Sequence, residues 1–202
     1  MGRLFVVGEQ RLLSRGRPAV KVTPTDLPEV LLVEPAVFAD ARGCFGETYR
    51  ADQYAAAGIH DRFVQDNLSV SHRGVLRGLH FQHPRGQAKL VYVVQGEVLD
   101  VAVDVRTGSP TRAHWVSTRL SSENRRQLYI PAGFAHGFVV LSESAVVAYK
   151  CSDYYAPAAE HCVRWDDPDL AVDWPIRDPV LSSKDASAPL LRDIPPDLLP
   201  RV

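Results

Sequence analysis

The sequence predicts an all-β domain, folded as a sandwich or a barrel. Between residues 75 and 151 it carries short segments rich in Val, Leu and Tyr, which is the composition of strands. Turn signals separate these segments, among them Gln95–Gly96, Thr107–Pro110 and Ser142–Ser144. No helical pattern alternates with them, which argues against a parallel α/β sheet. Many short strands with regularly spaced turns are typical of sandwiches and barrels.

The composition is that of one ordinary globular domain. The chain has 202 residues, of which 46% are hydrophobic, enough for one sizeable core. A net charge of -1 provides no basic field that would indicate nucleic-acid binding. Three widely spaced cysteines, Cys44, Cys151 and Cys162, do not make a disulfide framework. No segment reaches the roughly 18 apolar residues of a membrane helix. We therefore expect a cytoplasmic protein with no membrane partner.

The beginning of the chain predicts few regular elements. Residues 1–20 are basic and poorly patterned, so we expect an N-terminal extension ahead of a single domain at residues 21–202. Leu27–Pro35 is a short apolar run bounded by prolines and is expected to be an edge strand. The next elements are expected to be a turn at Phe38–Gly43, a strand at Cys44–Tyr49 and an alanine-rich helix at Ala51–Ala57. Gly58 is expected to end that helix.

From residue 63 onward the pattern is strand after strand. Phe63–Val70 alternates in polarity, and its Gln65 and Asn67 are two residues apart and so share one face. Later strands are expected at Val75–Phe81, Lys89–Val94, Val98–Val105, Trp115–Leu120, Arg126–Ile130, Gly137–Leu141 and Ala145–Cys151. After Cys151 the chain is aromatic, acidic and proline-rich, which predicts loops and a short helix near Leu181–Asp185.

His80 is the first candidate for chemistry. It lies in an apolar run, with Arg77 three residues before it and Lys89 nine residues after it. A histidine on a rigid strand beside two cations suits a base that acts on an anionic substrate. Tyr149 and Asp185 could complete acid–base chemistry with it. Taken singly, each of these residues also has an ordinary structural interpretation, as a core or surface histidine, a core tyrosine and a solvated aspartate.

The segment Pro131–Phe138 has the form Pro-x-Gly-x-x-His, the second half of a cupin-type motif. Such a turn delivers a histidine, here His136, into the mouth of a small β-barrel. In metal-binding cupins the first half supplies His-x-His and a downstream Glu. Here the matching region has only His80 and His83, whose spacing places them on opposite sides of a regular strand. This deficit of ligands predicts that the site holds no metal.

Separate cations point to an anionic ligand. Arg42, Arg77 and Lys89 each lie beside a small residue and form no charge run, so they either converge on a phosphate or are merely solvated. The chain has no P-loop and no Gly-x-Gly-x-x-Gly, which excludes the common nucleotide-hydrolysing and dinucleotide folds.

The ordered set of motifs resembles the dTDP-4-dehydrorhamnose 3,5-epimerase family. The resemblance runs from about Val22 to Pro189. The segments that carry it are Asp40–Glu47, Gln65–Ser69, Gly74–Gln82, Gln87–Leu90, Val101–Arg106 with Gly108–Thr111, Ile130–Phe138, Tyr149–Cys151, Tyr155 with Pro157 and Glu160, Trp165–Pro168 and Leu181–Asp185. The N-terminal extension departs from the family pattern.

The resemblance implies a cupin-like jelly-roll barrel or sandwich with a few short peripheral helices, assembled as a homodimer without a cofactor. It makes His80 the general base, Tyr149 the general acid, Asp185 the partner of His80, and Lys89 the group facing the substrate ketone. The implied substrate contacts are Arg42, Glu47, Gln65, Asn67, Arg77, His136, Tyr155, Glu160 and Lys184. Some of them, Arg42 and Glu47 especially, are expected to reach the neighbouring subunit's site.

The implied reaction is epimerisation of dTDP-4-dehydro-6-deoxy-D-glucose at C3 and C5. The sequence leaves three alternatives open. The enzyme could invert C3 only, the protein could be a non-catalytic sugar-nucleotide-binding cupin, or it could be a metal-dependent cupin enzyme.

Overall fold

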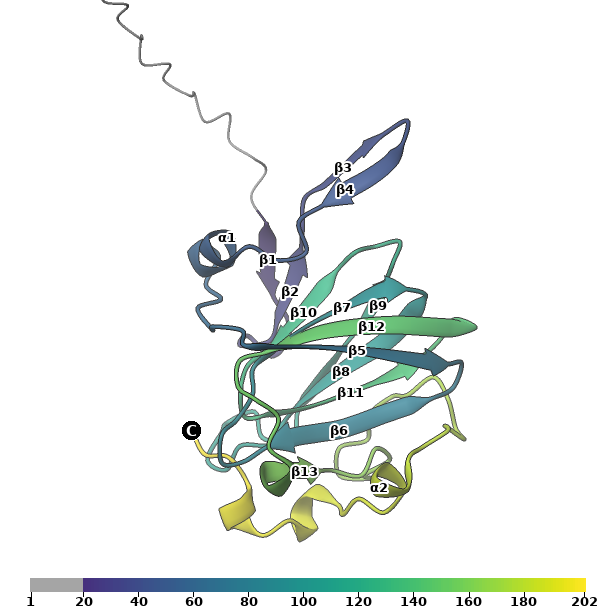
Figure 1. Cartoon of the computed structure of the whole chain (residues 1–202). Coiled ribbons are helices and arrows are strands. Elements are labelled where there is room, and N and C mark those ends of the chain that lie inside the picture. Colours follow the sequence, from purple (N-terminus) through teal and green to yellow (C-terminus); the bar gives the residue numbers. More distant parts are fainter. Residues whose placement is uncertain (1–19) are drawn as a thin grey trace, which may run out of the picture.

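The structure, a computed structural model, describes residues 20–202. The expected N-terminal extension therefore lies, apart from Val20, outside the described residues. Within the described part, two large antiparallel sheets pack face to face, and a small two-stranded hairpin projects from them (Figure 1). The prediction of an all-β fold is confirmed. No helix among residues 20–202 is long and apolar enough to cross a membrane.

The first sheet has six strands in the order β1-β2-β10-β7-β12-β5. Its strands are β1 (Lys21–Pro24), β2 (Leu31–Glu34), β10 (Gln127–Ile130), β7 (Lys89–Gln95), β12 (Ser144–Cys151) and β5 (Gln65–His72). The second sheet has five strands in the order β13-β6-β11-β8-β9. Its strands are β13 (Glu160–Cys162), β6 (Leu76–Gln82), β11 (Phe134–Val140), β8 (Glu97–Asp104) and β9 (Trp115–Ser121).

The remaining elements are short and peripheral. The hairpin is formed by β3 (Val37–Asp40) and β4 (Gly43–Gly46), and the helices are α1 (Ala51–Ala56), α2 (Ser183–Ala186) and three 3₁₀ turns at Pro157–Ala159, Leu191–Asp193 and Pro196–Leu198. Helix α1 begins where the sequence predicted it and ends one residue earlier.

Alternation along β8 explains how the second sheet is buried on both faces. Val98 and Ala102 belong to the core between the two sheets, together with residues of the first sheet such as Val91. Val101 and Val103 point the other way and pack under the C-terminal segment. The strand is therefore a buried layer between the first sheet and the chain end, and the C-terminal segment closes the fold.

Two local predictions were wrong. The Leu27–Pro35 run gives strand β2, but β2 lies between β1 and β10 and is not at an edge. The edge is formed by Lys21–Pro24 instead. The sequence did not predict this strand, because its few apolar residues give no strong strand signal. The predicted turn at Phe38–Gly43 is mostly strand, since Phe38 pairs with Phe45 and the reversal is confined to Ala41 and Arg42.

A bulge in β6 helps to form the cavity. His80 is opposite His136 on β11, but Arg77 is opposite Phe138, so three residues of β6 span two of β11. Gly78 makes this possible: its φ is +135°, and a Cβ there would lie 2.5 Å from the Cα of Gly137. The extra residue lets Arg77 and His80, three apart in sequence, line the same cavity.

Candidate active site

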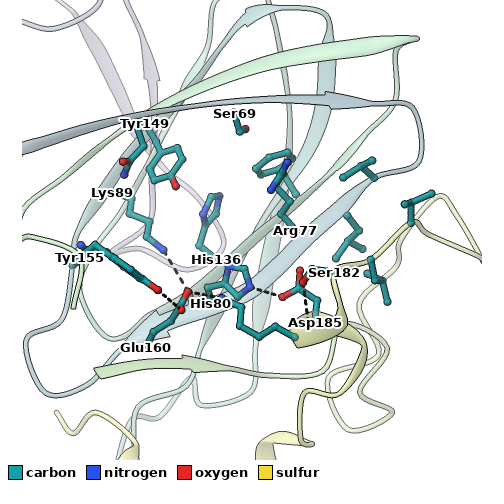
Figure 2. A pocket seen from close by; sticks show the side chains of 18 of the residues that line it. Ser69, Arg77, His80, Lys89, His136, Tyr149, Tyr155, Glu160, Ser182 and Asp185 are labelled. Atoms are coloured by element: carbon teal, nitrogen blue, oxygen red, sulfur yellow. Dashed lines mark hydrogen bonds and ion pairs between the residues drawn. The ribbon is translucent and has the colours of Figure 1, made fainter. Parts of the chain in front are cut away.

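One cavity of about 770 Å³ collects most of the predicted site residues. The first sheet contributes Gln65, Asn67, Lys89 and Tyr149, and the second contributes Arg77, His80, His136 and Glu160. Tyr155, from the loop after β12, and Lys184 and Asp185, from α2, complete the wall. Figure 2 shows Lys89 and Tyr149 pointing into the cavity from one side, and His80 and Glu160 from the other. The volume falls in the range of small-molecule sites.

His80 and Asp185 form a close pair at the floor of the cavity. The Nε2 atom of His80 lies 2.6 Å from Oδ1 of Asp185, whose side chain is only 3% exposed. Ser182 caps α2 by accepting a hydrogen bond from the Asp185 backbone N–H, which fixes the carboxylate beneath β6. Burial by itself raises the pKa of Asp185. The hydrogen bond and the charge of His80 lower this pKa by more than burial raises it, so the pKa of Asp185 is below its ordinary value.

This pairing has a chemical consequence for the imidazole. An ionised Asp185 accepts only, so it favours the tautomer of His80 that carries its proton on Nε2. The other nitrogen, Nδ1, then holds a lone pair. A quarter of the His80 side chain is exposed, and that exposure is to the cavity. The pair can therefore act as a general base toward a bound ligand.

Tyr149 faces the cavity from the other sheet. It lies on β12, and Figure 2 shows its ring and hydroxyl on the opposite side of the cavity from His80. Burial raises the pKa of Tyr149, which keeps the phenol protonated at neutral pH. A protonated phenol opposite a neutral imidazole is the arrangement needed to move protons on two faces of one ring.

Lys89 supplies positive charge deep in the cavity. The residue is 9% exposed, and its ammonium donates to the backbone carbonyl of His80 over 3.5 Å. Burial lowers the pKa of Lys89, while the neighbouring Asp100 and Glu160 oppose that shift. Placed there, the amino group can stabilise negative charge on a ligand oxygen.

Glu160 organises the rim of the cavity. It accepts hydrogen bonds from the Tyr155 hydroxyl (2.8 Å) and from the Lys184 ammonium (2.7 Å). Burial by itself raises the pKa of Glu160. The two hydrogen bonds lower this pKa by more than burial raises it, so the pKa of Glu160 is below its ordinary value. The result is an ionised carboxylate held between two donors, where it can accept from ligand hydroxyls.

His136 belongs to a second histidine–carboxylate pair. Its Nε2 lies 2.9 Å from Oδ2 of Asp100, and both side chains are buried. His136 is the direct cross-strand neighbour of His80, so the two imidazoles meet on one face of the second sheet. His83 does not line this cavity, so the His80–His83 spacing gathers no pair of ligands.

Strand β5 adds a row of polar side chains. Gln65 donates to Asn67 over 3.0 Å, and Arg77 from β6 donates to the Ser71 hydroxyl over 3.0 Å. Between them, the Ser69 hydroxyl is buried without a hydrogen-bond partner in the part of the chain that the structure describes. Ser69 was not among the residues expected from the sequence, although it continues the Gln65–Asn67 alternation by one step. Its free hydroxyl can bond to a ligand.

Arg42 and Glu47 are not part of the cavity wall. Arg42 forms the exposed tip of the β3–β4 hairpin, where it donates to Asp40 over 2.6 Å. Glu47 follows β4 directly. The expectation that both serve a neighbouring subunit stays a prediction.

Comparisons with known proteins agree on one family. The family model for dTDP-4-dehydrorhamnose 3,5-epimerase matches residues 24–193. A dTDP-4-dehydrorhamnose 3,5-epimerase of Pseudomonas aeruginosa is 54% identical over 86% of this chain and 97% of its own. A dTDP-4-dehydrorhamnose 3-epimerase of Streptomyces niveus is 46% identical over 86% and 85%.

A solved structure shows the same agreement in three dimensions. The dTDP-6-deoxy-D-glucose-3,5-epimerase of Legionella pneumophila, in complex with dTDP-4-keto-L-rhamnose, superposes with a TM-score of 0.88. It is 53% identical and covers 91% of this chain and 98% of its own. The chain therefore belongs to the dTDP-4-dehydrorhamnose 3,5-epimerase family of isomerases.

Proposed function

We propose that the protein epimerises dTDP-4-dehydro-6-deoxy-D-glucose at C3 and C5, giving dTDP-4-dehydro-L-rhamnose, without a metal or organic cofactor. The observation that carries the proposal is the placement of His80 and Tyr149 on opposite sheets around one cavity, in a chain of this family. The acid, the base and the group that stabilises the intermediate are all side chains of the protein.

The substrate's C4 ketone acidifies the hydrogens on C3 and C5. His80, through Nδ1, accepts such a proton, and Asp185 stabilises the imidazolium that forms. The electrons move to the ketone oxygen, where Lys89 stabilises the enolate. Tyr149 then donates a proton to the opposite face of the same carbon. One such cycle inverts one centre. After His80 releases its proton to solvent and Tyr149 regains one, a second cycle inverts the other centre.

The nucleotide holds the sugar in place for these steps. Arg77, Gln65 and Asn67 line the cavity, where a diphosphate and its sugar would meet donors. Glu160, Tyr155 and Lys184 form the rim. Binding energy from the remote nucleotide then positions the reacting carbons.

The active form is a homodimer in this proposal. Arg42 and Glu47 belong to a segment that stands away from the body of the protomer (Figure 1) and do not line their own cavity. The hairpin exposes apolar side chains, with Phe38 at 48% and Phe45 at 66%, as expected of a surface that a second copy covers. A dimer would let each hairpin bring its Arg42 to the other protomer's cavity.

The second candidate function is epimerisation at C3 alone. The similarity to the Streptomyces niveus 3-epimerase favours it. Both reactions use one base and one acid beside a C4 ketone. They differ in the number of ring carbons that are deprotonated and then reprotonated on the opposite face.

Deuterium exchange tests the proposal directly. The protein is incubated with the 4-keto sugar nucleotide in D₂O, and proton NMR follows C3 and C5. We expect deuterium at both positions and inversion of both centres in the product. Exchange confined to C3 would support the 3-epimerase, and no exchange would support a non-catalytic binder.

Two variants sharpen this experiment. His80→Asn should abolish exchange while circular dichroism shows an intact fold, because the amide has no basic nitrogen. His83→Asn is the matched control, since His83 is close in sequence but outside the cavity wall, and it should exchange like the wild type. Appreciable exchange in His80→Asn would remove His80 as the base.

A further inference from the structure

Cys162 lies against the His80–Asp185 pair and has no role in the reaction described above. In the β13–β6 ladder, Cys162 is directly opposite His80, so both side chains project to the same face. The Cys162 thiol lies 3.9 Å from Oδ1 of Asp185. One donor atom from each of the three residues lies within 4.8 Å of the other two. Burial raises the pKa of the Cys162 thiol to about 12, so without a metal it is a neutral, inert thiol.

We propose that His80, Cys162 and Asp185 form an inhibitory site for a thiophilic divalent cation, with Zn²⁺ as the representative ion. The inhibitory effect rests on the proposed role of His80 as the base, whereas binding of the cation does not. The three donors are an imidazole nitrogen, a sulfur and a carboxylate oxygen, which is a ligand set typical of zinc.

The geometry requires only small movements. Zinc bonds of about 2.0–2.3 Å in a tetrahedral site place the donor atoms roughly 3.3–3.6 Å apart. The present separations are 2.6 Å between His80 and Asp185 and 3.9 Å between Cys162 and Asp185. Asp185 lies on a helix of only four residues, so a shift on the order of an ångström moves only a short element. The cation displaces the thiol proton as it binds.

Binding there would reverse the tautomer of His80. In the free protein Asp185 keeps the ring proton on Nε2, and Nδ1 has the lone pair that accepts the substrate proton. A cation bound to Nε2 uses the lone pair of Nε2, so the ring proton leaves Nε2 and the neutral ring carries a proton on Nδ1 instead. The cation thus leaves the imidazole in place and removes its capacity to act as a base. The fourth position on the metal stays open for water or a small anion.

The chemistry of the ligands also predicts which ions act. Sulfur favours Zn²⁺, Cd²⁺ and Co²⁺ over the hard cations Mg²⁺ and Ca²⁺. The site can therefore respond to a transition metal while ignoring the Mg²⁺ that accompanies nucleotides.

The test begins with metal-free full-length protein, and epimerisation is measured against Zn²⁺ and, separately, Mg²⁺. We expect Zn²⁺ to inhibit and Mg²⁺ to have no effect. Cys162→Ala should keep the metal-free turnover and raise the half-inhibitory Zn²⁺ concentration at least about tenfold, since even losing an outer partner of a metal ligand costs that much. Cys162→Ser serves the same purpose if the alanine variant is unstable.

Cys151→Ala is the matched thiol control. Cys151 is also buried, but it lies near Asn67 and outside the three-donor cluster, so this variant should stay as sensitive to Zn²⁺ as the wild type, relative to its own metal-free rate. Every variant is assayed with the same substrate, so chelation of Zn²⁺ by the diphosphate is the same in each. Equal Zn²⁺ sensitivity of the wild type and Cys162→Ala overturns the proposal.

Co²⁺ provides a readout that is independent of activity. Its spectrum with the wild-type protein should show a sulfur-to-cobalt charge-transfer band that is lost in Cys162→Ala and kept in Cys151→Ala. Absence of the band in the wild type overturns the metal site. A band that forms without any inhibition overturns the role of His80 as base and leaves the metal site standing, so the two failures are distinguishable.

Discussion

At the scale of single residues, the site works by giving similar groups different surroundings. Two imidazoles, His80 and His136, lie side by side, and each has a carboxylate at Nε2. The His80 side chain is a quarter exposed, which suits its proposed role as the base, whereas the His136 side chain is only 7% exposed. In the proposed mechanism, exposure more than residue type therefore separates the proton acceptor from its neighbouring imidazole.

Tyr149 should be needed for inversion but not for abstraction. Tyr149→Phe removes the proton donor, so we expect net epimerisation to fall by about 10²–10⁴, the usual size of a general acid's contribution. Deuterium exchange at C3 should fall less, because His80 still removes the proton and can return it to the same face. Proton NMR measures both quantities in one sample.

Tyr155→Phe is the control for that prediction. Its hydroxyl donates to Glu160 at the rim, so its loss should weaken binding without separating exchange from inversion. If exchange and inversion fell equally in Tyr149→Phe, Tyr149 would have a role other than that of the acid.

At the scale of elements, strand alternation correctly predicts which residues of β5 share a face. Gln65 and Asn67 were expected on one face of a strand, and both line the cavity from β5. The same rule would have separated Arg77 from His80, because residues three apart point to opposite faces of a regular strand. Only the bulge at Gly78 brings them together, and it depends on contact with Gly137, which the local sequence does not encode.

Other parts of the site also depend on long-range contacts. Asp185 is 105 residues from His80, and Cys162 meets His80 through a three-residue edge strand. Neither proximity follows from periodicity. The assignment of His80, Tyr149 and Asp185 came from the family resemblance, whereas the residue patterns alone left their structural interpretations open.

The β3–β4 hairpin should control assembly. Phe45→Glu puts a charge on an exposed aromatic position of the hairpin, and we expect it to weaken the dimer by about 2 kcal/mol or more, as for a central interface aromatic. Light scattering after size exclusion should show a shift toward monomer, and the KM for the sugar nucleotide should rise because Arg42 is withdrawn.

Val202→Glu is the matched control, since Val202 is a comparably exposed apolar residue at the C-terminus. It should leave the mass and the KM unchanged. A Phe45→Glu protein with the wild-type mass would place the interface elsewhere.

At the scale of the whole molecule, a buried ionic network ties distant segments together. Asp104, at the end of β8, is fully buried and accepts hydrogen bonds from Arg106, Ser109 and Thr111. Arg106 also donates to Glu29, in the loop before β2, and stacks over Phe134. The network therefore links the end of β8, in the second sheet, to the loop before β2, in the first sheet.

Acid should weaken this network before it affects most of the core. Burial by itself raises the pKa of Asp104. Hydrogen bonds from Arg106, Ser109 and Thr111 lower this pKa by more than burial raises it, to about 2 from the ordinary 3.8. A lowered pKa stabilises the fold above about pH 4, and that contribution is lost as the pH falls toward 2. It amounts to about 2 kcal/mol between pH 5 and pH 2.

Urea unfolding of the wild type and Asp104→Asn at pH 5 and pH 2 measures this contribution. The difference in unfolding free energy between the two proteins should shrink by about 2 kcal/mol at the lower pH. Asp197→Asn, in an exposed turn, is the control and should track the wild type. A constant difference for Asp104→Asn would mean that the carboxylate contributes no acid sensitivity.

In the proposed mechanism the base, His80, belongs to one sheet and the acid, Tyr149, to the other, so the stereochemical outcome depends on the distance between the two sheets. Residues such as Val91 and Phe138, which fill the space between the sheets, set how far apart the two proton carriers are held. Repacking that layer would change which ring sizes can be inverted without altering a single reactive group. A search for epimerases of other sugars would then begin in the hydrophobic interior and not at the catalytic side chains.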